Sequence, residues 1–142
     1  MCPDVLQFLT YMAGRTERAQ LGSMVVVLPW HDPMRAAEEI AMLDNISDGR
    51  LILGLGPRAP ARWSSTASGS RMDESRPRFV ECAEMILGGL ESGYCEYDGA
   101  FVKQPRAAIR PAPVQVVPRP HLRRGRVARV AAASWPSSAS AS

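Results

Sequence analysis

Two short apolar runs separated by one amphipathic segment constrain the fold of this chain more than any other feature. The first run, GSMVVVLP at residues 22–29, is rich in β-branched residues and closes with proline, and the second, RLILGLG at residues 50–56, ends in glycine. Short continuous apolar runs bounded in this way predict strands that are buried on both faces, and such strands are usually parallel. The sequence therefore predicts a βαβ unit and an α/β fold.

The segment between the two runs predicts the connecting helix. Asp32 is a suitable N-cap, Pro33 suits the first helical position, and Gly49 is the glycine expected just past the end. The residues expected on the buried side of this helix are Met34, Ala37, Ile40, Ala41 and Ile46.

Two more helices and a turn are expected outside the βαβ unit. Apolar residues at helical spacing predict an early helix that ends near Gly14 and a later one in MDESRPRFVECAEMILGGL, residues 72–90. Asp73 and Ser75 are the cap candidates of the later helix, and its glycine pair, residues 88–89, is expected to fray its end. The Asp-Gly pair at residues 98–99 predicts a short hairpin or an ordered loop.

Two segments fit neither helix nor strand, and they carry much of the positive charge. Residues 57–71 hold three arginines and no acid, and residues 114–142 hold five arginines and no acid. The other segments retain nine basic residues against fourteen acidic ones, so the net charge of +3 describes the two Arg-rich segments and not the rest. This distribution weakens any inference of nucleic-acid binding from the overall charge.

Cysteine and histidine usage indicates no metal site. The chain has three cysteines without CxxC spacing and only two histidines, whereas metal ligands usually occur in short paired spacings. Cys82 lies on the apolar side of the later helix and is expected to pack as a small hydrophobic residue. There is no N-terminal signal pattern, and the longest apolar run is too short to span a bilayer, so a reducing cytoplasm is the expected compartment.

The segment GSMVVVLPWHDPMRAAEEIAMLDNISDGRLILGLG resembles the luciferase-like flavin-dependent monooxygenases around strands 3 and 4 of their (β/α)8 TIM barrel. The flanking segments GRTERAQLG and MDESRPRFVECAEMILGGLESGYCEYDGAFVKQPRAAIRPAP match as well. The resemblance covers residues 2–56 and 72–113. It implies that residues 1–113 are a fragment of such a barrel domain, followed by a disordered tail at residues 114–142.

The resemblance implies an oxidoreductase that uses reduced flavin and dioxygen on a small organic substrate. The cofactor is FMN in many members and the deazaflavin coenzyme F420 in others, and it binds at the carboxyl ends of the barrel strands. Three residues correspond to flavin-contacting positions: Met24 and Val25, which a non-proline cis peptide joins in family members, and Gly56, where luciferases place a reactive cysteine. No catalytic residue is implied by the match, and no metal.

Other interpretations of the same residues remain open. Met24 and Val25 also suit an ordinary strand core, and His31 suits a solvated turn. The GLGPRA segment fits a dinucleotide-binding fingerprint, but the prolines that follow make a Rossmann helix start implausible. A barrel needs about 250 residues, so we expect that the isolated chain does not form the flavin site unless another chain or a larger oligomer completes it.

The Arg-rich segments leave two hypotheses. In the first, residues 57–71 are an out-of-frame insert: codons can be chosen for RWSSTASGSR and VQVVPRPHLR such that shifted frames read VEFDGFRVA and FKSFRDRTYA, which resemble the family. In the second, the chain is a small binding protein whose Arg-rich tail contacts nucleic acid or acidic partners. The tail has one aromatic residue, Trp135, and so lacks the interleaved stacking groups of single-strand binders.

Overall fold

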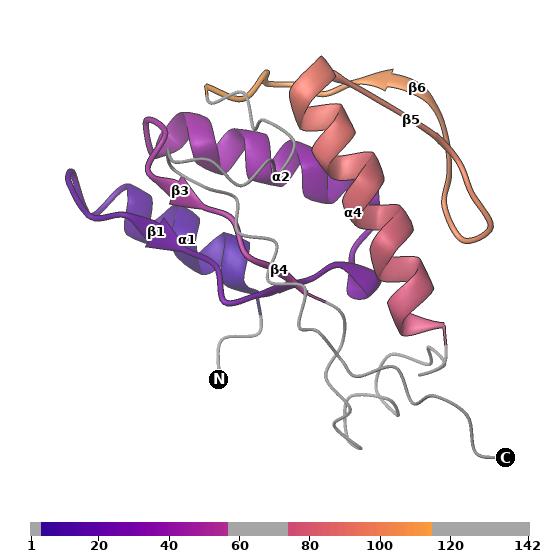
Figure 1. Ribbon diagram of the computed structural model, residues 1–142. Helices are drawn as coiled ribbons and strands as arrows, with labels where there is room; N and C mark the ends of the chain where they lie inside the picture. Colours follow the sequence, from indigo (N-terminus) through magenta and orange to yellow (C-terminus); the bar gives the residue numbers. More distant parts are fainter. Residues whose placement is uncertain (1–3, 57–73, 115–142) are drawn as a thin grey trace, which may run out of the picture.

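The computed structural model describes residues 4–56 and 74–114, which form an α/β arrangement of three helices and short strands (Figure 1). Helix α2 packs against both α1 and α4, and the strands between residues 21 and 56 run beside these helices. The described residues form an α/β fragment with no closed barrel. The segments predicted to be an insert and a disordered tail, 57–71 and all but the first residue of 114–142, lie outside the described residues.

The predicted βαβ unit is confirmed, but each predicted strand is divided into two pieces. Strand β1 (Leu21–Gly22) pairs with β3 (Leu51–Ile52), and β2 (Val26–Val27) pairs with β4 (Leu55–Gly56), in both cases parallel. The expectation that the first run is buried on both faces along its length is wrong. Gly22 is exposed because nothing packs over it, and Met24 is 94% exposed, because residues 23–25 leave the ladder.

The first apolar run also ends earlier than predicted. Residues Leu28–Trp30 form a 3-10 turn, η1, in which the N–H of His31 donates to the carbonyl of Leu28 at 3.0 Å. Pro29 lacks the N–H that a ladder would need, and its fixed φ suits a tight turn. The turn brings the chain directly to the start of the next helix.

Helix α1 (Val5–Ala13) and helix α2 (Pro33–Ile46) begin with the same kind of cap. Asp4 accepts from the N–H of Gln7 at 3.0 Å, and Asp32 accepts from the N–H of Arg35 at 2.9 Å. A side-chain carboxylate at this position satisfies a backbone donor that has no partner within the helix. The predicted Asp32 cap and the predicted end of α1 at Gly14 are therefore confirmed.

The buried side of α2 differs from the prediction at its carboxyl end. Ile40 and Ala41 are buried as expected, but Ile46 is 47% exposed, and Leu43 is buried in its place. Leu43 lies one helical turn beyond Ile40, at i+3, and so continues the stripe that faces the core. The chain leaves α2 through two residues in the left-handed region, Asp48 and Gly49, one residue earlier than expected.

Helix α4 (Ser75–Ser92) runs through the glycine pair that was expected to fray it. Gly89 faces Cys95, and a Cβ at position 89 would lie 2.4 Å from the Cys95 Sγ atom. Glycine is required at position 89 because of this close approach. It therefore does not mark the end of the helix. Its actual end is at Gly93, whose φ of 79° closes the helix in the left-handed conformation.

The N-terminal side of α4 also differs from the prediction. Glu74 occupies the cap position and makes no side-chain cap hydrogen bond, so Ser75 is not the N-cap. Ser75 is instead the first helical residue and is buried. Asp73 lies outside the described residues.

The segment after α4 forms the predicted hairpin. Strand β5 (Tyr94–Asp98) pairs antiparallel with β6 (Lys103–Ala108), with an irregularity between Cys95 and Tyr97. The hairpin lies along α4 (Figure 1). The side chain of Glu81 on α4 accepts hydrogen bonds from three consecutive backbone N–H groups in the hairpin turn, those of residues 100–102, at 2.8 to 3.0 Å.

The core lies between the three helices and the strand segments. Its fully buried large side chains lie between residues 26 and 109 and include Val26, Leu28, Ile40, Leu43, Leu55, Ile86, Leu90 and Ile109. Burying side chains of this size contributes about 1.5–3 kcal/mol each. The helices and the hairpin are therefore held by one continuous apolar cluster.

One arginine ties the amino ends of the strands to the ends of two helices. The Arg50 guanidinium donates to the carbonyls of Ala13, Ala19 and Ser47 at 3.1, 2.9 and 2.7 Å, and to the Thr16 hydroxyl at 3.0 Å. These acceptors include backbone carbonyls at or just past the carboxyl ends of α1 and α2, which have no partner within the helix. The planar fork of arginine suits several acceptors at once.

Candidate functional site

The site begins at the interruption between the two parallel strand pairs. Ser23 lies at the interruption and is only 2% exposed. Its hydroxyl oxygen accepts from the N–H of Gly54 at 2.8 Å, and the hydroxyl donates to the carbonyl of the same residue at 3.0 Å. The side chain thereby takes the place of the backbone partners that a regular ladder would supply.

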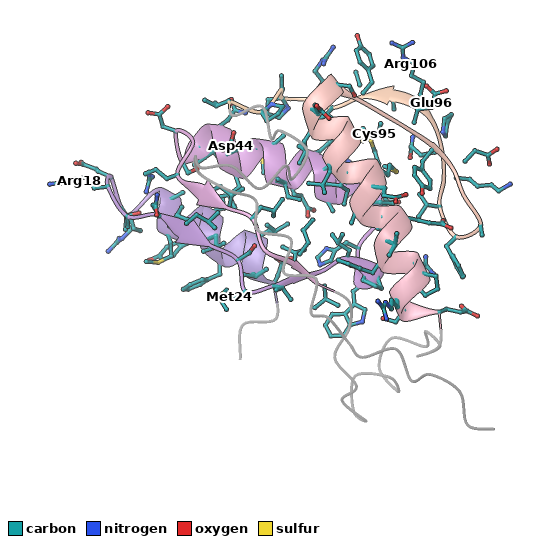
Figure 2. All side chains as sticks on the ribbon, viewed as in Figure 1. Arg18, Met24, Asp44, Cys95, Glu96 and Arg106 are labelled. Carbon is teal, nitrogen blue, oxygen red and sulfur yellow. The ribbon has the colours of Figure 1, made fainter. Side chains whose placement is uncertain are left out.

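Met24 and Val25 follow Ser23 directly. The peptide bond between them is cis, as the resemblance implied. Met24 is 94% exposed, and Figure 2 shows it at the margin of the molecule, on the side away from α2. Val25 is half-buried. The two residues thus form an apolar edge that other side chains of the described part do not cover completely.

Gly56, the third predicted residue, lies against Val25. A Cβ at position 56 would be 2.7 Å from the Val25 Cγ2 atom and 3.3 Å from its Cβ atom. Such distances leave no room for a side chain unless Val25 moves. The structure therefore brings Val25 and Gly56 together, and Met24 is joined to them through its peptide bond.

This edge suits a flat apolar group better than a polar one. Its surface consists of an exposed thioether side chain, a valine side chain and a glycine backbone, and it includes Gly56 at the carboxyl end of β4. Ligand sites of parallel α/β folds lie at that end of the strands. The residues fit the ring system of a flavin.

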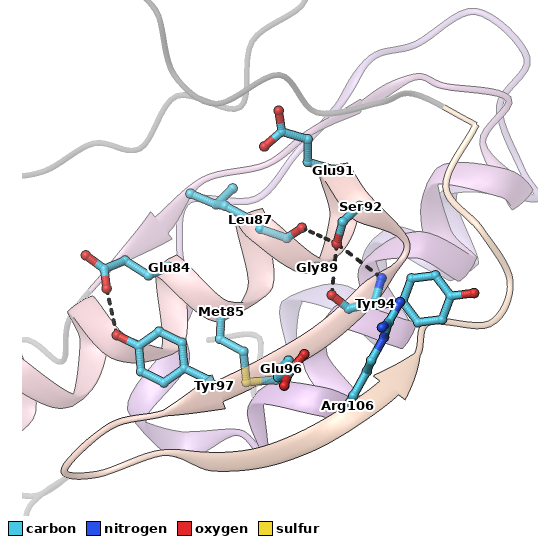
Figure 3. Close-up of a pocket in the computed structure, with 11 residues that line it drawn as sticks. Glu84, Met85, Leu87, Gly89, Glu91, Ser92, Tyr94, Glu96, Tyr97 and Arg106 are labelled. Carbon is cyan, nitrogen blue, oxygen red and sulfur yellow. Dashed lines mark hydrogen bonds between the residues drawn. The ribbon is translucent and has the colours of Figure 1, made fainter.

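A separate hollow of about 970 Å³ lies between α4 and the hairpin and contains none of the three predicted residues. The Tyr97 hydroxyl donates to the Glu84 carboxylate at 2.7 Å, and this bond raises the pKa of Tyr97 to about 12. The Arg106 guanidinium stacks over the Tyr94 ring at 4.6 Å from its centroid (Figure 3). The bond between Tyr97 and Glu84 joins the hairpin to the helix, whereas Arg106 and Tyr94 both lie on the hairpin.

The two cysteines of the described part are buried. Cys82 is fully buried, as predicted, and so is Cys95. Burial raises the pKa of both thiols, which keeps them in the protonated form. Among residues 4–56 and 74–114, no group of three or more His, Cys, Asp or Glu side chains is placed to hold a metal ion.

No helix in the described ranges is both long enough and apolar enough to cross a membrane.

Sequence reasoning missed the role of Ser23. In the sequence, Ser23 is simply a polar residue inside an apolar run. Its role is not visible there because its hydrogen bonds are to Gly54, which lies 31 positions later. The residue that could have indicated this role is Gly54 in the second apolar run. Glycine is required there because a Cβ would lie 2.2 Å from the carbonyl oxygen of Ser23. A small polar residue in one strand opposite a glycine in the next is the pattern that indicates such an interruption.

Comparison with known proteins relates the chain to one family. The model of the luciferase-like monooxygenase family matches residues 1–135. The beta chain of the alkanal monooxygenase of Photobacterium leiognathi is 33% identical over 102 residues, which are 72% of this chain and 31% of that protein. The chain thus spans about a third of the length of the curated relatives that it matches.

Solved structures show the same relation. The monooxygenase RslO1 of Streptomyces bottropensis superposes with a TM-score of 0.75 at 35% identity, over 80% of this chain and 34% of the other. The coenzyme F420 dependent tetrahydromethanopterin reductase of Methanopyrus kandleri has a TM-score of 0.67 at 28% identity, over 79% and 36% of the two chains. Each similar structure is about three times as long as the matched part of this chain.

Proposed function

The chain belongs to the luciferase-like monooxygenase family, and from this premise we propose that it forms part of an oxidoreductase that oxygenates an organic substrate with reduced flavin and dioxygen. When bound, the flavin supplies the electrons that activate dioxygen, and the protein positions and shields it. The contact between Val25 and Gly56, the residue at the carboxyl end of β4, is the observation that carries this proposal.

Met24, Val25 and Gly56 are the residues that contact the flavin ring in this proposal. The exposed Met24 side chain supplies apolar area, and Val25 supports the ring from one side. Gly56 contributes backbone alone, so no thiol is offered to the cofactor at this position. A reactive-cysteine role at position 56 is accordingly not part of the proposed mechanism.

FMN is the cofactor that we propose, with coenzyme F420 as the alternative. The similarity to monooxygenases favours FMN. The similarity to a reductase that depends on coenzyme F420 supports the alternative. Both cofactors carry a planar tricyclic ring, which the apolar edge fits equally well. An aldehyde is the first substrate class to test, because the similar Photobacterium enzyme is named for alkanals.

Turnover by this chain alone is not expected. The described residues offer two parallel strand pairs, whereas a complete barrel encloses its site with eight strands and their loops. A second chain or a larger oligomer that supplies the remaining strands would complete the site. We therefore propose that the chain binds flavin weakly and that oxygenation requires such a complement.

Cofactor titration followed by NMR tests the proposed site. With FMN added to the labelled chain, we expect shift changes at the backbone of Met24, Val25 and Gly56, and the same experiment with coenzyme F420 ranks the two cofactors. Gly56→Ala should weaken binding by about tenfold, or about 1.4 kcal/mol, because its new methyl group displaces Val25.

Gly22→Ala is the matched control. Gly22 is also a strand glycine, but a Cβ there would have nothing within 4 Å, so this variant should bind like the parent chain. A folded chain that shows no shift changes with either cofactor would overturn the proposal. Shift changes confined to Tyr94 and Tyr97 would overturn the proposed site.

A further inference from the structure

The pairing between the strands is maintained across the interruption by a single side chain. The backbone N–H of Ser23 donates to the carbonyl of Ile52 at 3.1 Å, and the N–H of Val26 donates to the carbonyl of Gly54 at 2.8 Å. Between these two bonds the Ser23 hydroxyl bonds both backbone groups of Gly54. The hydroxyl is therefore the link between β1–β3 and β2–β4.

The two residues of this link are in close backbone contact. A Cβ at position 54 would lie 2.2 Å from the carbonyl oxygen of Ser23, so only glycine fits. Ser23 is 2% exposed, and water has little access to the bonds that it makes. A buried N–H group that loses its only partner costs about 1–3 kcal/mol, so the geometry of this link is strongly favoured.

The link lies next to the candidate flavin edge on both strands. Ser23 precedes the Met24–Val25 peptide directly, and Gly54 lies two residues before Gly56. We propose that Ser23 is a positioning residue whose hydroxyl, by holding Gly54, sets Val25 against Gly56 and leaves Met24 facing outward. The effect of Ser23 on flavin binding rests on the function proposed above. Its effect on the contact between Val25 and Gly56 does not depend on that function.

The effect of removing the hydroxyl is expected to be local. The backbone bonds of Ser23 and Val26 to the other strand do not involve the side chain, so both strand pairs remain. The Gly54 N–H loses its hydrogen-bond partner. The side chain of residue 23 then no longer holds Gly54 in place. The contact between Val25 and Gly56 then loses the constraint that the hydroxyl supplies and depends on the β2–β4 pairing alone.

Two substitutions of nearly equal shape isolate the hydroxyl. Ser23→Thr keeps it, and Ser23→Val replaces it with a methyl group. The matched control is Ser47→Ala, because Ser47 is also fully buried and its hydroxyl donates to the carbonyl of Asp44 at 3.2 Å, at the opposite ends of the strands. The full chain is used throughout, with its unfolding midpoint measured for every variant.

Two readouts separate positioning from general stability. Without flavin, the measurements are the NOE between the Val25 methyl groups and the Gly56 α-protons, and the exchange rate of the Gly54 amide. With FMN as the probe, the measurement is the dissociation constant from the NMR titration. We expect Ser23→Val to lose the NOE, to speed the Gly54 exchange by about tenfold or more and to weaken FMN binding by about threefold or more, the tenfold corresponding to about 1.4 kcal/mol.

Ser23→Thr should retain all three properties, and Ser47→Ala should retain them even where its midpoint falls as far as that of Ser23→Val. A Ser23→Val chain that keeps the NOE and the slow Gly54 exchange would overturn the inference, as would a folded Ser23→Thr chain that loses them. If no variant binds FMN but the NOE follows the hydroxyl, the proposed function fails and the positioning role stands. Ser23→Ala replaces Ser23→Val in the comparison if the valine chain does not fold.

Discussion

At the scale of single residues, Glu81 shows how one carboxylate fixes a turn about twenty positions away. Its oxygens accept from the N–H groups of Ala100, Phe101 and Val102 at 3.0, 2.8 and 2.9 Å. Burial alone would raise the pKa of Glu81, but these three backbone donors outweigh it and hold the pKa below 4.5. The hairpin turn is therefore attached to α4 by a group whose charge matters.

This pKa shift predicts a pH-dependent stability of the chain. Because the folded state binds the proton of Glu81 less tightly than the unfolded state does, the contribution of Glu81 is complete above pH 4.5 and is lost as the pH falls through its lower folded value. Glu81→Gln should lower the unfolding midpoint at neutral pH and should flatten its decline in acid. Thermal unfolding measured from about pH 7 to about pH 3 checks both effects.

Glu96→Gln is the control for this experiment, since Glu96 is an exposed glutamate of the same hairpin. It removes an equal charge without removing the Glu81 hydrogen bonds. Parallel midpoint curves for the parent chain and Glu81→Gln would contradict the prediction.

At the scale of elements, the two adjacent glycines of α4 have opposite surroundings. A Cβ at Gly88 would have nothing within 4 Å, whereas a Cβ at Gly89 would lie 2.4 Å from the Cys95 Sγ atom and 3.0 Å from the Ile109 Cδ1 atom. Both residues are inside the helix. The helix and the hairpin therefore approach each other most closely at Gly89.

The two glycine-to-alanine substitutions should change stability in opposite directions. Gly88→Ala is expected to raise the free energy of unfolding by about 0.5–1 kcal/mol, because alanine loses less conformational freedom in a helix. Gly89→Ala is expected to lower it by about 1–3 kcal/mol, because the added methyl group overpacks the contact with Cys95 and Ile109. Urea denaturation of both variants checks this prediction, and equal effects at the two positions would refute it.

Sequence reasoning predicted the elements well where the cause is local. The Asp32 cap, the proline at the start of α2 and the Asp-Gly turn all depend on neighbouring residues, and all are confirmed. The interruption at Ser23 depends on Gly54, 31 positions later, and the continuation of α4 through Gly89 depends on packing against Cys95 of the next element. Apolar patterns report burial, but they do not report which backbone groups meet across strands.

The candidate site was predictable only in part, for the same reason. The resemblance pointed to Met24, Val25 and Gly56, and the contact between the last two is present in the structure. Their role in flavin binding stays a prediction. The residue that holds the contact, Ser23, carries no local signal.

At the scale of the whole molecule, the described strands between residues 21 and 56 form two parallel pairs whose outer edges are not covered by further strands of the described ranges. Unpaired strand edges present backbone donors and acceptors to other chains. A complementing chain that continues the sheet would satisfy these groups and would also close the region around Met24. Strands that cover these edges would therefore also enclose the candidate site.

Sequencing the coding region with its flanks tests the hypothesis that the Arg-rich segments are out of frame. We expect single-base changes near residues 57–71 and 114–142 to restore stretches like VEFDGFRVA and FKSFRDRTYA, and the flanks to encode further barrel strands. The intervening segment, residues 72–113, should need no internal change, which serves as the control. A genomic sequence that encodes the chain without any nearby insertion or deletion would refute the hypothesis.

The unequal spacing across the strand interruption has an evolutionary consequence. Three residues separate Gly22 from Val26, whereas two separate their partners Ile52 and Leu55, so the first strand carries one residue more than the ladder needs. Deleting a single codon at residues 23–25 would equalise the spacing and allow an uninterrupted ladder. An ancestral strand could thus have acquired the outward Met24 edge by one codon insertion, without any change in the helices that surround it.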